Sequence, residues 1–196
     1  MKKIIKLRKL FKGYDLDGYI VPKNDNFFGE YVSASEDNLK YISNFTGSAG
    51  FAVILKNKNF MFVDGRYTIQ ASNQCGRDYK ICTIPEIYPF KIFNNKILNL
   101  GFDPRLHTEN SLNRLFKNSF IKLKPINENL IDLLWKRKKD LNIKPFYLIK
   151  NKDAGKKVEN KLAKLVKLIK LNRVDYLFTT ASENVAWLLN IRGHDT

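Results

Sequence analysis

The sequence contains few of the residues that form disulfide frameworks or metal sites. Its 196 residues include two cysteines and two histidines. Cys75 and Cys82 form no CxxC pair, so we expect reduced thiols, in the core or at the surface, and a cytoplasmic location. His107 and His194 match neither an HExxH nor an HxxxH pattern, and the carboxylates show no ligand spacing. The sequence therefore predicts no metal site in this chain.

Long apolar runs are also missing. No stretch approaches the roughly 20 apolar residues that span a bilayer, so we expect no membrane contact. Lys6, Arg8 and Lys9 interrupt the apolar run that an N-terminal signal peptide requires. Hydrophobic residues nevertheless make up 44% of the chain, which is typical of a globular protein and not of a disordered one.

Acidic residues are scarce relative to basic ones. The chain has 19 Asp and Glu against 35 Lys and Arg, which gives a formal net charge of +16. A stand-alone basic module with non-specific affinity for nucleic acid is therefore the alternative function, because such proteins gain affinity by releasing counterions. Only Lys136–Lys139 forms a basic run, and the other lysines are scattered. That scatter favours a solvated surface, so nucleic acid is not the partner that we expect.

Hydrophobic periodicity predicts an α/β layer fold. Ile4, Leu7 and Phe11 share one face of a helix over residues 3–12, which Gly13 is expected to end in a left-handed cap. The apolar runs at 51–55 and 60–63 predict a β-hairpin. Alternation of strands and helices along the chain favours a mixed sheet flanked by helices. We further expect a strand at 19–21, a loop over 23–35, helices near 37–42, 66–75, 88–94 and 108–118, and strands near 79–83, 97–102 and 120–124.

A polar, lysine-rich stretch over residues 136–153 predicts a linker. It separates a first domain at 1–135 from a second segment at 154–196. In this segment we expect an amphipathic helix over 154–171, with Asp153 as its N-cap, and a strand over 174–178. Two tryptophans in apolar runs, Trp135 and Trp187, are expected to anchor the cores.

The beginning and the end of the chain resemble each other. Residues 37–47 align without a gap with residues 183–193, and residues 16–21 resemble 174–178. This pattern predicts two copies of one domain, of which the second is incomplete. Each exposed Leu or Ile forgoes about 1.5–3 kcal/mol of burial. We therefore expect residues beyond about 150 to be poorly ordered or aggregation-prone unless a partner covers them.

Two short motifs are the strongest local signals. Phe45–Gly50 reads FTGSAG, and Val63–Tyr67 reads VDGRY after the predicted hairpin. Together with other segments in the same order, they resemble the first domain of the Xaa-Pro aminopeptidases, in the creatinase/prolidase family. The resemblance covers essentially the whole chain. The other segments that carry it are Tyr19–Pro22, Glu30–Val32, Gly101–Pro104, Glu128–Trp135 and Ala186–Gly193.

The resemblance implies a creatinase-type N-terminal domain followed by an incomplete second copy. Enzymes of this family release an N-terminal residue that precedes proline. They use two metal ions, usually manganese, held by two Asp, one His and two Glu of a C-terminal pita-bread domain. We expect that domain to be absent here, so this chain binds no cofactor and is inactive alone. Its implied role is a scaffold for dimerisation and substrate access, with a homodimer or a separately encoded catalytic half as partner.

The resemblance also singles out Arg66. The arginine of the DGRY motif reaches the peptide substrate in the family, and Arg66 stands at that position. A guanidinium offers a fork of donors to a carboxylate or to backbone carbonyls. The alternative, that Arg66 only caps a turn or pairs with Asp64, stays open. Ser48 lies in the Gly-rich loop without a nearby histidine in sequence, so we expect it not to act as a nucleophile.

Overall fold

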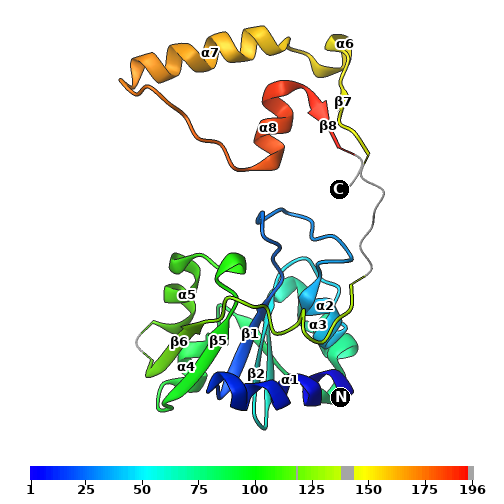
Figure 1. The fold of residues 1–196 in the computed structure, drawn as a ribbon, viewed down its shortest axis with the longest axis vertical. Coiled ribbons are helices and arrows are strands. Elements are labelled where there is room, and N and C mark those ends of the chain that lie inside the picture. The colour runs from blue at the N-terminus through cyan, green and yellow to red at the C-terminus, as the bar shows by residue number, and fades with distance from the viewer. Residues whose placement is uncertain (118, 138–143, 194–196) are drawn as a thin grey trace. The chain divides into compact units, whose positions relative to one another are not determined.

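The computed structural model describes residues 1–117, 119–137 and 144–193. The chain divides into two compact units. The first consists of residues 1–26 and 32–138, and the second of residues 27–31 and 139–196. Figure 1 shows the elements of each unit, most of them labelled. No helix among the described residues is long and apolar enough to cross a membrane.

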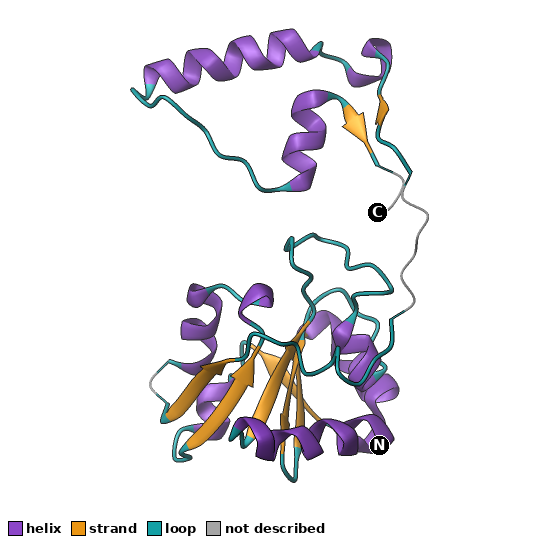
Figure 2. Ribbon diagram, in the orientation of Figure 1, coloured by secondary structure: helices purple, strands orange, loops and turns teal. Residues whose placement is uncertain are grey.

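The first unit is built on one six-stranded mixed sheet (Figure 2). Its strands are β1 (Gly18–Pro22), β2 (Phe51–Leu55), β3 (Asn59–Asp64), β4 (Lys80–Ile84), β5 (Leu98–Phe102) and β6 (Ile121–Pro125). They lie in the order β4-β3-β2-β1-β5-β6. The pairs β1–β2 and β2–β3 are antiparallel, and the pairs β1–β5, β3–β4 and β5–β6 are parallel. The predicted α/β class and the predicted hairpin are confirmed.

Helices cover both faces of this sheet, because side chains along a strand point alternately to opposite faces. On β2, Ala52 and Ile54 face a core completed by the first three helices, and Val53 and Leu55 face a core completed by the next two. All ten residues of β1 and β2 are buried. The five helices are α1 (Lys2–Phe11), α2 (Asn38–Ser43), α3 (Thr68–Cys75), α4 (Pro89–Phe93) and α5 (Glu109–Phe116).

The end of α1 differs from the expectation. Gly13 is not the left-handed residue, because a 3₁₀ turn over Lys12–Tyr14 prolongs the helix. Asp15 takes the left-handed conformation instead, with φ at 52°. The N–H of Leu16 then donates to the carbonyl of Phe11 across 3.0 Å. An Asp side chain tolerates this backbone region better than most residues do, so glycine is not required there.

The described residues of the second unit form three helices and a two-stranded sheet. The strands β7 and β8 are antiparallel, and β7 and all but the last residue of α6 fall within the 136–153 stretch for which a linker is expected. The domain limits derived from the sequence stay a prediction. The elements are β7 (Tyr147–Leu148), α6 (Asn151–Ala154), α7 (Val158–Leu171), α8 (Ser182–Leu189) and β8 (Ile191–Arg192).

Three expectations for this unit are wrong. Asp153 lies inside α6 and caps nothing, since Gly155 at φ 70° separates α6 from α7. Residues 174–178 form no strand, because no strand within the described part of the unit pairs with them. Trp187 is 57% exposed and anchors no core. By contrast Trp135 is partly buried and stacks on a tyrosine ring of the first core.

The correspondence between the two units extends to individual contacts. In the first unit, Lys3 Nζ lies 4.4 Å from the centre of the Tyr41 ring and donates to the Tyr41 carbonyl. In the second, Lys161 Nζ lies 4.2 Å from the centre of the Trp187 ring and donates to the Trp187 carbonyl. Tyr41 and Trp187 are matched positions of the sequence repeat, which supports a common origin of the two units.

The helix ends repeat as well. Asn44 after α2 and Asn190 after α8 are both left-handed, with φ of 64° and 51°. Burial differs, however. Leu7 on α1 is fully buried, whereas Leu162 and Val166 on α7 are 39% and 47% exposed. The uncovered face of α7 agrees with the reasoning behind the expected aggregation, but poor order beyond residue 150 stays a prediction.

Candidate functional site

The two motifs singled out in the sequence meet in the first unit. Phe45–Gly50 forms the loop that leads into β2, and Gly65–Tyr67 forms a 3₁₀ turn directly after β3. The hydroxyl groups of Ser48 and Tyr67 lie 2.7 Å apart, so one donates to the other. The antiparallel pairing of β2 with β3 brings the start of one strand beside the end of the other, and hence joins the motifs. We call Thr46, Ser48, Asp64, Arg66 and Tyr67 the motif surface.

Small residues in the loop are required by close packing over Phe45. The Phe45 ring is fully buried and meets the Tyr67 ring edge-on at 5.8 Å. A Cβ on Gly47 would lie 2.2 Å from Cζ of Phe45, and a Cβ on Gly50 would lie 2.9 Å from the Phe62 carbonyl oxygen. Gly50 also has φ at 151°, which L side chains rarely adopt. The glycines therefore fix the course of the loop and do not form a phosphate cradle.

Two glutamines on α3 hold the loop through hydrogen bonds to Thr46, and the sequence analysis did not identify them. Gln74 Oε1 accepts from the N–H of Thr46 at 2.8 Å, and its Nε2 donates to Thr46 Oγ1 at 2.8 Å. Gln70 Nε2 donates to the same hydroxyl at 2.9 Å. The available signal was the i, i+4 spacing of the two glutamines, which places both on one helix face. This latch keeps the loop against α3.

Arg66 projects from the turn with its side chain 71% exposed. Asp64 Oδ1 accepts from the N–H of Arg66 at 2.9 Å, and the carboxylate also accepts from Nε at 3.1 Å and Nη2 at 2.7 Å. The guanidinium lies 5.2 Å from the centre of the Tyr67 ring. The hydrogen bond from Arg66 lowers the pKa of Asp64, so this carboxylate stays charged well below neutral pH. The pairing with Asp64 that the sequence left open is confirmed.

The pairing with Asp64 leaves some hydrogen-bond donors of the Arg66 guanidinium unused. Nε and Nη2 face Asp64, and within the described residues no hydrogen bond reaches Nη1. The carboxylate orients the guanidinium and leaves an exposed edge that can donate to an incoming carbonyl or carboxylate. The Tyr67 ring packs against one side of the guanidinium. Contact of Arg66 with a substrate stays a prediction.

Among the described residues, no group of three or more His, Cys, Asp or Glu side chains is placed to hold a metal ion. His107 packs edge-on against Phe102, and burial lowers its pKa to about 4. His194 lies outside the described residues. Cys75 and Cys82 are both free thiols in the core, and burial raises the pKa of Cys75 to about 11.

Comparison with known families matches this architecture twice. A model of the Creatinase/Prolidase N-terminal domain matches residues 3–132, and a second model of the same description matches residues 137–196. The chain belongs to the creatinase/prolidase N-terminal domain family. The tandem match agrees with the internal repeat, and the first match contains the whole motif surface.

Curated relatives align along nearly all of the chain. A probable Xaa-Pro aminopeptidase P of Coprinopsis cinerea is 31% identical over 204 residues, which cover 99% of this chain and 33% of the relative. Xaa-Pro aminopeptidase 1 of Dictyostelium discoideum is 33% identical over 211 residues, which cover 99% of this chain and 34% of the relative. The chain thus spans about a third of the length of the curated relatives that it matches.

Solved structures agree with the fold. An X-prolyl aminopeptidase from Caenorhabditis elegans, described as a cytosolic enzyme with a di-nuclear active site, superposes with a TM-score of 0.85. It is 28% identical, and the match covers 99% of this chain and 35% of that one. The N-terminal domain of the peptidase PepQ from Mycobacterium tuberculosis matches with a TM-score of 0.54 at 20% identity, covering 68% of this chain and 98% of that domain. The second likeness shows the fold alone.

Proposed function

We propose that this chain is the N-terminal, non-catalytic part of a metal-dependent Xaa-Pro aminopeptidase. The main support is the extent of the matches. Two models of the N-terminal domain match in tandem, and 99% of the chain aligns with about a third of the length of each of two Xaa-Pro aminopeptidases. The enzyme would act in the cytoplasm and release the first residue of a peptide whose second residue is proline. No comparison supports the alternative of a nucleic-acid-binding module.

The chain would contribute scaffold and not chemistry. Its described residues do not fit a two-metal centre, because no three potential ligands come together. The two metal ions, manganese in this proposal, would be held by a catalytic domain outside this chain, so no reaction step is assigned to residues here. Ser48 bonds to a tyrosine hydroxyl, which does not activate a serine as a neighbouring base does. The chain alone is therefore expected to be inactive, and dimerisation through its units is part of the proposal.

Within that scaffold, Arg66 would contact the peptide. Asp64 orients the guanidinium, which is charged in any case, and the exposed edge carries the remaining donors. A charge-assisted hydrogen bond to a peptide carbonyl or carboxylate contributes about 1.5–3 kcal/mol. The Tyr67 ring, itself hydrogen-bonded to Ser48, would help to position the guanidinium for that contact.

The experiment compares the chain with a fusion that carries it. One sample is the 196-residue chain, and the other joins it to the catalytic region of the Dictyostelium relative. With manganese added, the fusion should release the first residue of an Xaa-Pro peptide, and the chain alone should release none. Release by the purified chain alone would refute the non-catalytic role. An inactive fusion beside an active, intact relative would refute the scaffold role.

A further inference from the structure

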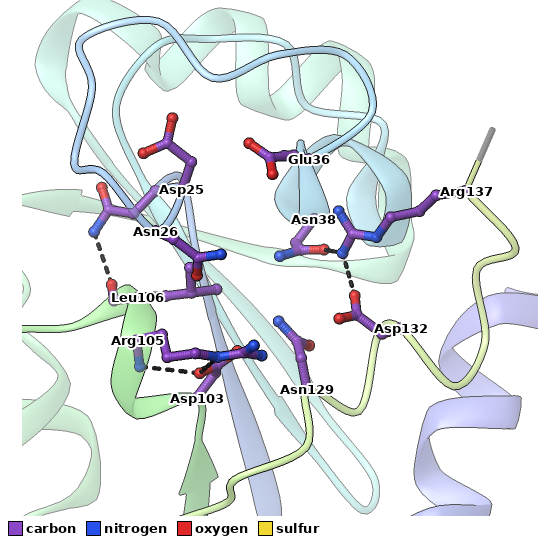
Figure 3. A pocket seen from close by; sticks show the side chains of 11 residues that line it. Asp25, Asn26, Glu36, Asn38, Asp103, Arg105, Leu106, Asn129, Asp132 and Arg137 are labelled. Atoms are coloured by element: carbon purple, nitrogen blue, oxygen red, sulfur yellow. Dashed lines mark hydrogen bonds and ion pairs between the residues drawn. The ribbon is translucent and has the colours of Figure 1, made fainter. Parts of the chain in front are cut away.

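A polar pocket lies beyond the carboxyl ends of β1 and β5 in the first unit (Figure 3). These two strands are adjacent and parallel, and in open α/β sheets ligands bind in the crevice outside such strand ends. One wall follows β1 at Asn24–Asn26, and another follows β5 at Asp103–Leu106. The cavity of about 200 Å³ has the volume of roughly seven water molecules.

Two buried amides direct their donors into this space. Asn38 Oδ1 accepts from Arg137 Nη2 at 2.7 Å, and Asn129 Oδ1 accepts from the N–H of Ile131 at 2.9 Å. These bonds fix which atom of each amide is oxygen, so the NH₂ groups occupy the other positions. Both side chains belong to residues that are only 4% exposed.

The two NH₂ groups have no hydrogen-bond partner in the part of the chain that the structure describes. Figure 3 shows both nitrogens turned toward the space between the walls. Neither nitrogen is among the described buried side-chain atoms that lack a partner, so both are accessible from the pocket and free to donate to an acceptor inside it. These two donors are held in place by internal hydrogen bonds of their own amide oxygens and do not depend on the charged groups around the pocket.

An oriented guanidinium adds to these donors. Asp103 is 1% exposed, and its two oxygens accept from Nε and Nη2 of Arg105 at 3.0 and 2.8 Å. Arg105 is thereby held at the pocket wall with Nη1 unused by any described residue. Two amides and one guanidinium together match the acceptor oxygens of a carboxylate.

The pocket also offers an acceptor for a donor group of the ligand. Glu36 lines the same pocket, and within the described residues its carboxylate has no hydrogen-bond partner. We propose that the pocket binds a free α-amino acid. Asn38, Asn129 and Arg105 receive its carboxylate, and Glu36 receives its ammonium group. The site lies apart from the motif surface and uses none of its residues, so this inference does not depend on the proposed function.

The test is a titration of the ¹⁵N-labelled 196-residue chain, followed by NMR. L-Alanine is the probe, with L-alaninamide, which lacks the carboxylate, and N-acetyl-L-alanine, which lacks the ammonium group, as matched compounds. L-Alanine should give saturable shifts at the side-chain amides of Asn38 and Asn129. The two matched compounds should bind at least about tenfold more weakly. Absence of saturable shifts, which means that the pocket holds water only, would overturn the proposal, as would equal binding of L-alaninamide.

Two single-group variants test the donors. Asn38→Asp and Asn129→Asp keep the oxygen that accepts the internal hydrogen bond and replace the inward NH₂ with a charged acceptor. Each should weaken L-alanine binding by about tenfold or more. Asn57→Asp makes the same charge change on the exposed hairpin turn and should leave binding unchanged. If a variant unfolds by circular dichroism, Arg105→Lys, which removes the fork but keeps the charge, takes its place. Unchanged binding in a folded variant refutes the site.

Discussion

The ion pair between Lys23 and Asp37 offers a quantitative test of how the N-terminus of α2 is held in the first unit. Lys23 Nζ lies 2.5 Å from Asp37 Oδ2, and the two side chains are only 9% and 7% exposed. The same carboxylate caps α2, because Oδ1 accepts from the N–H of Lys40 at 2.9 Å. Asp37 therefore has two roles that substitution can separate.

A substitution that removes both roles should lower the free energy of unfolding strongly. In Asp37→Ala the loss of the N-cap costs about 1 kcal/mol, and leaving Lys23 buried without its partner costs about 3–5 kcal/mol. The sum is a large part of the roughly 5–15 kcal/mol that stabilises a typical domain. Asp37→Asn keeps an acceptor for the cap and should lose the ion pair alone. In the double variant Lys23→Met, Asp37→Ala no charge stays buried, so most of the loss should be recovered.

The assay is urea unfolding in a Trp187→Phe background, so that fluorescence reports Trp135 in the first unit. Lys56→Met breaks the exposed pair with Asp17, whose side chains are 63% and 30% exposed, and serves as the control. It should change the free energy of unfolding by at most about 1 kcal/mol. A loss no larger than this in Asp37→Ala, or a double variant no more stable than Asp37→Ala, would refute the reasoning.

Three further predictions concern the loop, the second unit and pH. Gly47→Ala should lower the free energy of unfolding by about 1–3 kcal/mol, because its Cβ would lie 2.2 Å from the fully buried Phe45 ring; no loss in urea unfolding would refute the packing. Lys161→Met should lower the free energy of unfolding of the second unit by about 1.5–3 kcal/mol, since Lys161 is only 5% exposed and its ammonium group donates to the Trp187 carbonyl. If Trp187 fluorescence shows the same unfolding midpoint in urea with and without the substitution, this prediction is wrong. The pKa of His107 is about 4 in the folded protein because of burial, against 6.5 for the exposed side chain of the unfolded protein, so the stability associated with the neutral imidazole is complete above pH 6.5 and is lost as the pH falls toward 4. In His107→Gln the stability curve should be flatter by up to about 3 kcal/mol over that window, and identical curves would exclude the effect.

The first unit was largely predictable because its patterns are local and its sheet is complete. Buried runs such as Phe51–Leu55 bounded by turn residues specify strands, and Ile4, Leu7 and Phe11 specify the buried face of α1. The end of α1 was not predictable in the same way, since either Gly13 or Asp15 can satisfy the local geometry.

The second unit was predicted less well because its elements depend on partners. Residues 174–178 have the composition of a strand, but a strand requires a neighbour that supplies hydrogen bonds. Trp187 has the composition of a core residue and is instead covered on one ring face by Lys161. The repeat itself was visible from sequence, since Asn44 and Asn190 are matched positions.

The site was predictable only in part. The motifs around Ser48 and Arg66 were visible as residue patterns, whereas the latch at Gln70 and Gln74 depends on which face of α3 meets the loop. The polar pocket draws its walls from segments about a hundred residues apart, such as Asn38 and Asn129. No local pattern announces such a meeting.

The claim that joins the fold to the proposed function is that Arg66 contacts the peptide. The most direct measurement is the steady-state kinetics of the active fusion on an Xaa-Pro peptide, comparing Arg66→Lys with Arg77→Lys, which alters an exposed arginine on the turn after α3. Loss of one charge-assisted hydrogen bond predicts a KM raised by about tenfold or more for Arg66→Lys, with kcat little changed. Arg77→Lys should leave both constants unaltered. If the two variants have the same KM, Arg66 serves only to pair with Asp64, and the proposed contact is wrong.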